Sequence, residues 1–202
     1  MLKIIDISDI YIEQVVDVHL QAFKGYLNTK LGTWYVKRFI CWFASNDKAI
    51  AVCAIYMDEV VGYIVGAPTG YSSELTRYIF WSALCGAITR FWVFFDPKYL
   101  RVLLARAGVY HYRPNQIPDL PAPTMSLVGI GVRPDARGKN VGKLLMQTFE
   151  QQAQSKGAKS LRLSVYPENL NAQKLYERMG WQKHSLETPS GAIYYYKLIT
   201  AK

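Results

Sequence analysis

Residues 125–146, with the sequence MSLVGIGVRPDARGKNVGKLLM, constrain the fold of this chain more than any other stretch. Mostly apolar residues run as far as Pro134, and a polar turn with two glycines and three cationic side chains then leads into a sequence with helical periodicity. A strand followed by a short loop and a helix brings the free N–H groups of the helix N-terminus to one point. This order of elements predicts a site for an anion such as a phosphate.

The loop at 137–143, RGKNVGK, contains the groups that such a site needs. Its glycines let the backbone approach a ligand closely, and its cations add positive charge. The sequence matches neither the P-loop pattern GxxxxGK[ST] nor GxGxxG. A tight turn with solvated cations is the alternative interpretation, and anion binding is the favoured one. The residues predicted to bind the anion are Arg137, Gly138, Lys139, Asn140, Val141, Gly142 and Lys143.

Strands and helices alternate along the whole chain, which predicts an α/β (α+β) fold with a mixed sheet in a single domain over 1–202. The segment between the first two helices, 23–32, is expected to be a loop that carries Gly25, Tyr26 and Asn28, and its aromatic residues are expected either to pack or to line an acceptor site. Strands are predicted at 2–6, 49–57, 60–67, 124–133, 160–166, 181–187 and 192–199, and helices at 9–23, 33–44, 140–156 and 169–179. A helical pattern also covers 72–113, where Asp96-Pro97 is expected to divide two helices.

The 24 Lys and Arg residues outnumber the 15 Asp and Glu residues and give a net charge of +9, which favours anionic partners without choosing among them. Net charge is the only feature in favour of nucleic-acid binding. The apolar run at 78–89 is too short to span a bilayer. Since no secretory signal precedes the first strand, we expect a cytoplasmic protein.

The cysteines and histidines give no pattern of a metal site. The three cysteines are far apart in apolar sequence, and we expect buried free thiols in a reducing compartment. The three histidines are equally scattered, so no metal is predicted. The residues concerned are Cys41, Cys53, Cys85, His19, His111 and His184.

The sequence YPENLNAQKLYERMGW at 166–181 is the second stretch that could carry chemistry. Helical spacing puts Tyr176 on the inner face of the predicted helix, together with Leu175. A core tyrosine is the leading interpretation of that spacing, and a phenol that donates a proton in a partly dry site is the other. Asn169 and Asn171 are candidates for a helix cap or for amides that bind a ligand.

Together, the two stretches resemble the Gcn5-related N-acetyltransferase (GNAT) superfamily. Its motif Arg/Gln-x-x-Gly-x-Gly/Ala matches residues 137–142, with Asn140 in place of the first glycine. Asn is the non-glycine residue that best tolerates a left-handed backbone, so the loop can keep its shape. The later motif, Asn-x-x-Ala-x-x-Leu-Tyr-x-x-x-Gly-aromatic, resembles residues 169–181. The helical region 72–118 has no counterpart in the minimal family fold.

The resemblance implies a GNAT-like mixed, mostly antiparallel sheet flanked by helices, with acetyl-CoA bound between two splayed strands. Residues 129–133, including Ile130, Gly131 and Val132, would pair with the pantetheine, and the N–H groups of 137–143 would hold the pyrophosphate. Asn169 and Asn171 would lie near the cofactor. Tyr176 would be the catalytic residue that protonates the departing thiolate.

The predicted function is transfer of an acetyl group from acetyl-CoA to an amine of a small-molecule acceptor, such as an amino sugar or another anionic or amphiphilic metabolite. The aromatic and arginine-rich insertion at 72–118 is the predicted acceptor site; core packing, a homodimer contact and peripheral membrane contact are its alternatives. A protein or peptide N-acetyltransferase and a non-catalytic acyl-CoA sensor are the competing functions. No residue stands out as a general base, and Glu74, His111 and Asp119 are expected to be surface or packing residues.

Overall fold

The computed structural model describes residues 1–90, 119–184 and 191–199. The N-terminal half contains β1 (Lys3–Asp6), the 3-10 helix η1 (Asp9–Tyr11), α1 (Ile12–Ala22), α2 (Leu27–Lys30), α3 (Thr33–Ala44), β2 (Ile50–Tyr56), β3 (Glu59–Pro68) and α4 (Ser72–Thr89). The rest contains β4 (Thr124–Val132), the 3-10 helix η4 (Pro134–Ala136), α6 (Val141–Ser155), β5 (Ser160–Val165), α7 (Leu170–Arg178), β6 (Gln182–His184) and β7 (Ile193–Leu198).

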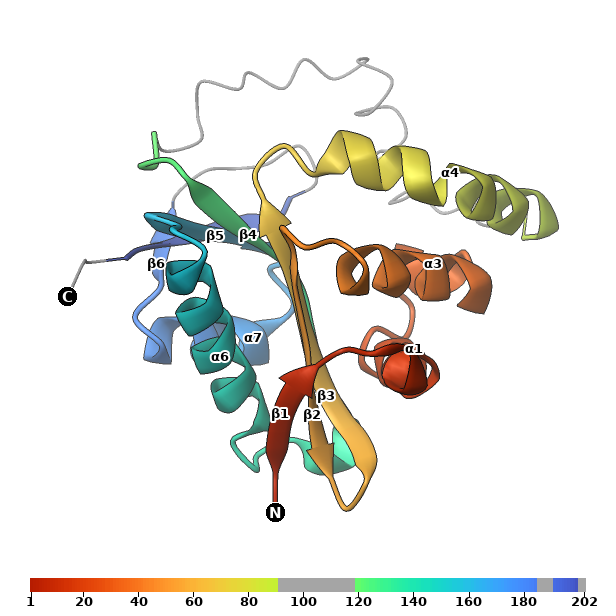
Figure 1. Cartoon of the computed structure of the whole chain (residues 1–202), viewed down its shortest axis with the longest axis horizontal. Helices are drawn as coiled ribbons and strands as arrows, with labels where there is room; N and C mark the ends of the chain where they lie inside the picture. Colours follow the sequence, from red (N-terminus) through yellow and green to blue (C-terminus); the bar gives the residue numbers. More distant parts are fainter. Residues whose placement is uncertain (91–118, 185–190, 200–202) are drawn as a thin grey trace.

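The seven strands form one sheet in the order β1-β2-β3-β4-β5-β7-β6 (Figure 1). Every neighbouring pair is antiparallel except β4 and β5, which run parallel. The predicted mixed, mostly antiparallel sheet is therefore confirmed.

Helices cover both faces of the sheet, with α1, α3 and α4 on one side and α6 and α7 on the other (Figure 1). Side chains of β2 alternate between the two layers, as a strand buried on both faces requires. Cys53 and Ile55 join the core under α1 and α3, whereas Val52 and Ala54 join the core under α6. No helix in the described ranges is long and apolar enough to cross a bilayer.

Most predicted elements are found within two residues of their expected bounds. The prediction of a plain loop at 23–32 is wrong, because its second half forms the single-turn helix α2. Of the helical pattern predicted at 72–113, α4 is described, and residues 91–118 lie outside the described part of the chain. The prediction of buried cysteines holds for Cys53 and is wrong for Cys85, which lies on an exposed face of α4.

Candidate active site

Strands β4 and β5 separate after a short paired stretch. They are in register only over Thr124–Ser126 and Ser160–Arg162, and beyond this point β4 pairs with β3 alone while β5 pairs with β7. A cleft of about 670 Å³ lies beside the edge of β4 that is left free, and its other walls come from the end of α1, the start of α6 and α7.

A β-bulge lies in β4 where the two strands separate. Val65 is paired with Gly129 and Gly66 with Leu127, so β4 has one residue more than β3 at this place. Bulges bend a strand and redirect its groups, and they are frequent beside active sites. The backbone edge that follows, including Ile130 and Val132, lines the cleft.

The loop at 137–143, here called the glycine loop, turns the chain from η4 into α6. Two of its residues have left-handed backbones, Gly138 with φ 76° and Asn140 with φ 61°. Asn140 is the N-cap residue of α6. The expectation that asparagine would adopt the conformation of the missing motif glycine is confirmed.

The backbone donors of this loop are available to a ligand. Within the described part of the chain, no hydrogen bond uses the N–H groups of residues 138–143. These groups converge at the N-terminus of a 15-residue helix, where the helix dipole also favours negative charge.

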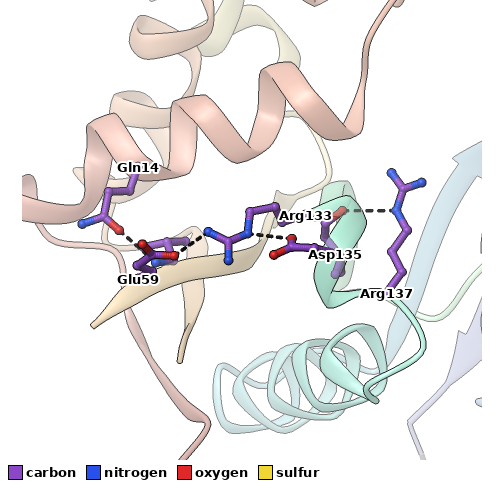
Figure 2. Close-up of polar contacts among 7 residues, drawn as sticks. Gln14, Glu59, Arg133, Asp135 and Arg137 are labelled. Carbon is purple, nitrogen blue, oxygen red and sulfur yellow. Dashed lines mark hydrogen bonds and ion pairs between the residues drawn. The ribbon is translucent and has the colours of Figure 1, made fainter. Parts of the chain in front are cut away.

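Arg133 and Arg137 lie near each other at the edge of the cleft, but within the described part of the chain only Arg133 pairs with carboxylates. Arg133 lies between two carboxylates and pairs with Glu59 and Asp135, each at 2.7 Å (Figure 2). Arg137 lies apart from these carboxylates and donates from Nε to the carbonyl of Val132 at 3.4 Å.

Three cations line the cleft, and none of them forms an ion pair within the described ranges: Arg137, Lys143 and Arg178. Unpaired cations beside free backbone donors give this end of the cleft the properties of a polyanion site.

The wall formed by α7 contains the second predicted motif. Asn169 caps the helix, because its side-chain oxygen accepts the N–H of Ala172 at 3.2 Å. The methyl groups of Leu175 lie against the glycine loop, and a Cβ at Gly142 would be 3.2 Å from Leu175 Cδ2. Gly142 therefore allows α6 and α7 to approach each other.

Tyr176 is buried, with 4% of its surface exposed, and it lines the cleft. Its ring packs on Trp181 and Tyr195, with centroid distances of 6.1 and 5.7 Å. Burial is the largest cause that raises the pKa of Tyr176, followed by the neighbouring Tyr26 and Tyr195. The phenol is thus protonated at neutral pH.

The segment after α1, whose aromatic residues are expected from the sequence either to pack or to line an acceptor site, forms a further wall of the cleft. Ala22, Phe23 and Tyr26 line the cleft there, and the ring of Tyr26 packs on Tyr166 with a centroid distance of 5.7 Å. Glu168 also lines this part. We call Tyr26 and Glu168, together with Tyr166 in ring contact with Tyr26, the tyrosine end of the cleft. The only sequence signal was the aromatic content of the segment after α1.

A polar pair is buried behind this wall. Nδ1 of His19 is 2.6 Å from the hydroxyl of Tyr63, while Nε2 of His19 is buried without a partner among the described residues. Burial lowers the pKa of His19 to about 4 and raises the pKa of Tyr63. The Tyr63 ring lies against β4, because a Cβ at Gly131 would be only 2.6 Å from its Cε1.

The structure brings the residues predicted for the cofactor site into this one cleft, apart from Lys139, which does not line it. Those that line it are Ile130, Gly131, Val132, Arg137, Gly138, Asn140, Val141, Gly142, Lys143, Asn169, Asn171 and Tyr176. The prediction missed Arg178 at the end of α7 and Glu168 before its start. The described part of the insertion, α4, contributes no lining residue and packs on α3, with Arg38 over the ring of Tyr78.

The weak candidates for a general base do not enter the cleft. Glu74 and Asp119 are exposed and do not line it. His111, like residues 91–118 as a whole, lies outside the described residues.

The sequence profile of the Acetyltransferase (GNAT) family matches residues 13–181. The chain belongs to the GNAT acetyltransferase family. No curated protein sequence matches it.

Solved structures of GNAT enzymes are similar to this chain over nearly its full length. PaiA N-acetyltransferase from Thermoplasma acidophilum, in complex with coenzyme A, has a TM-score of 0.62 at 14% identity, covering 98% of this chain and 99% of its own. The ribosomal-protein-S18-alanine N-acetyltransferase of Escherichia coli has a TM-score of 0.60 at 12% identity and covers 100% and 96%. AAC(6')-Iy, in complex with the bisubstrate analogue CoA-S-monomethyl-acetylneamine, has a TM-score of 0.59 at 14% identity and covers 92% and 94%. At these identities the similarity establishes the fold.

Proposed function

We propose that this protein transfers an acetyl group from acetyl-CoA to an amine of a small-molecule acceptor in the cleft between β4 and α7. One observation carries the proposal: the free edge of β4, the glycine loop with its unpaired cations and the phenol of Tyr176 line the same cleft. Acetyl-CoA supplies the acetyl group as a thioester.

The residues of the cleft fit the chemistry of this donor. N–H groups and cations of the glycine loop suit its phosphates. The unpaired N–H and C=O groups of β4 suit an extended chain with amide groups, which would add to the sheet edge as a strand does. Asn169 and Asn171 line the cleft on its α7 side and offer amide groups to the same chain.

Tyr176 suits the role of proton donor. Because burial raises its pKa, the phenol holds its proton at neutral pH and can pass it to a departing sulfur. An acceptor amine has an ordinary pKa near that of lysine, about 10, and must lose a proton before it attacks. An N–H group of β4 at the bulge, where this strand has one residue more than β3, would stabilise an oxyanion formed beside the strand.

A thiol-release screen tests the proposal. The protein is incubated with acetyl-CoA and, in separate wells, with amino sugars, sugar nucleotides, polyamines, amino acids and peptides. We expect free CoA to appear faster with at least one small amine than with acetyl-CoA alone. Release with peptides only would indicate a protein acetyltransferase, and tight CoA binding without any release would indicate a sensor.

A further inference from the structure

The buried pair of His19 and Tyr63 lies against the strand that borders the cleft. Tyr63 on β3 is paired with Gly131 of β4, and a Cβ at Gly131 would be only 2.6 Å from Cε1 of the Tyr63 ring. A Cβ at Gly129 would be 3.6 Å from the Tyr63 hydroxyl. The ring of Tyr63 therefore extends along β4 from Gly131 to Gly129, where the β-bulge lies.

This part of β4 is supported by the Tyr63 ring. The two glycines have no side chains that could anchor the strand, and glycine allows the backbone more freedom than any other residue. Beyond Ser126, β4 is no longer paired with β5, so β3 is its one neighbouring strand among the described residues. A shift of the Tyr63 ring would therefore move the backbone that borders the cleft.

His19 supports a second wall of the cleft, the one at the end of α1. Its ring lies 4.8 Å from the ring of Phe23, which lines the cleft. A Cβ at Gly131 would be 3.3 Å from Cε2 of Phe23 and from Cβ of Ala22, so the end of α1 packs directly on β4. The bond of 2.6 Å between His19 Nδ1 and the Tyr63 hydroxyl thus joins the wall made by α1 to the wall made by β4.

A role in stability alone does not explain a histidine at this position. His19 is 3% exposed, and its Nε2 has no hydrogen-bond partner among the described residues. Burial lowers its pKa to about 4, so the ring is neutral at neutral pH. A buried polar atom without a partner costs free energy, and an apolar side chain would fill the space without that cost. What the imidazole adds is a directional bond that fixes the Tyr63 hydroxyl.

We propose that His19 and Tyr63 are positioning residues for acetyl transfer: their hydrogen bond fixes the end of α1 relative to the bulged segment of β4, and thereby the acceptor amine relative to the thioester. The inference rests on the proposed function. Neither residue lines the cleft, so both act through Phe23 and Gly131, which do line it. The glycine loop is held against α7 instead, so we expect CoA affinity to depend little on the pair.

Steady-state kinetics with the most active amine of the thiol-release screen test the pair. Tyr63→Phe removes the hydroxyl and keeps the ring. We expect kcat/KM for the amine to fall roughly tenfold because the reactants are misplaced, while the Kd for CoA stays nearly constant. His19→Leu should lose as much, and the double variant no more than either single one, because both changes remove the same bond. His19→Gln keeps an amide that can bond to the Tyr63 hydroxyl and should retain most of the activity.

Ile40→Val is the matched control for stability, because Ile40 on α3 is fully buried in the same core and does not line the cleft. Urea unfolding should show comparable losses of stability for Ile40→Val and Tyr63→Phe, with kcat/KM unchanged in Ile40→Val. Three results would overturn the inference: equal kcat/KM in wild type and Tyr63→Phe, equal falls in Tyr63→Phe and Ile40→Val, or no advantage of His19→Gln over His19→Leu.

Hydrogen–deuterium exchange keeps this test apart from the proposed function. In the CoA complex, we expect residues 129–132 of β4 to exchange faster in Tyr63→Phe than in wild type, and equally fast in Ile40→Val and wild type. Faster exchange in Tyr63→Phe, without thiol release for any amine, would reject acetyl transfer and leave the support of β4 by the pair standing. Thiol release with unchanged exchange and unchanged kcat/KM in Tyr63→Phe would reject the role of the pair alone.

Discussion

The two ends of the cleft are built from different parts of the polypeptide. The glycine loop presents backbone N–H groups, held by the left-handed residues Gly138 and Asn140 and by the start of α6. The tyrosine end presents side chains that come from two distant segments, after α1 and after β5. A backbone site accepts many side chains as long as its conformation is kept, whereas a side-chain site changes with each substitution. We expect substitutions at the two ends to affect different parameters.

Tyr176→Phe should have the largest effect on turnover. It removes the proton donor between the two ends and keeps the ring that packs on Trp181. We expect kcat to fall by roughly 100-fold or more, the usual contribution of a general acid, while the Kd for acetyl-CoA stays nearly constant. Steady-state kinetics and calorimetry measure the two values. Tyr195→Phe is the control, since Tyr195 donates to Glu177 at 2.9 Å and does not line the cleft; equal losses in both variants would remove Tyr176 from the mechanism.

Gly142→Leu should disable the glycine loop. A side chain at this position meets Leu175 and fills the space beside the free N–H groups. We expect the loop to reach its ligand-binding shape only against an overpacking cost of about 1–3 kcal/mol, which corresponds to a rise in the Kd for CoA of roughly 5- to 150-fold. Gln151→Leu, on the exposed face of α6, is the matched control. An unchanged Kd in Gly142→Leu would mean that the donor binds elsewhere.

His19, which is buried between α1 and β3, should make the free energy of unfolding depend on pH. Burial lowers its pKa from 6.5 in the unfolded chain to about 4. The stabilisation is therefore complete above pH 6.5 and decreases as the pH falls toward 4, with a loss of about 2 kcal/mol at pH 5. Urea unfolding at pH 7.5 and pH 5 measures this change.

His19→Gln is the reference for that experiment, because an amide can still bond to the Tyr63 hydroxyl and does not titrate in this range. Its stability should fall less than that of the wild type between the two pH values. Parallel pH dependence of the two proteins would show that other groups cause the change.

Asn140→Gly should have the smallest effect, because glycine adopts the same left-handed backbone without cost. Stability should stay within about 1 kcal/mol of the wild type, and CoA affinity should be nearly unchanged. Asn140→Val, which disfavours φ 61°, should lose about 1–2 kcal/mol and weaken CoA binding. If both variants behaved alike, the side chain of Asn140 rather than its backbone would matter.

The contrast between a site made by the local backbone and a site made by distant side chains also explains which features of the fold and of the cleft could be predicted from the sequence. The determinants of the glycine loop are local, since glycines, Asn140 and the helix start lie within seven residues. The position of Tyr176 followed from helical spacing. The contact of Tyr26 with Tyr166 joins residues far apart in the chain, and no periodicity reports it. The bond between His19 and Tyr63 likewise depends on how α1 packs on β3, and the short helix α2 is too brief for a periodic signal.

Hydrogen–deuterium exchange with and without CoA tests the central claim most directly. The account predicts that CoA slows exchange in three separate segments: the glycine loop at 137–143, β4 at 129–132 and the start of α7 at 169–176. Exchange in α3 and in β1 should stay the same. Slower exchange confined to segments outside this cleft, at CoA concentrations that saturate the protein, would contradict the account.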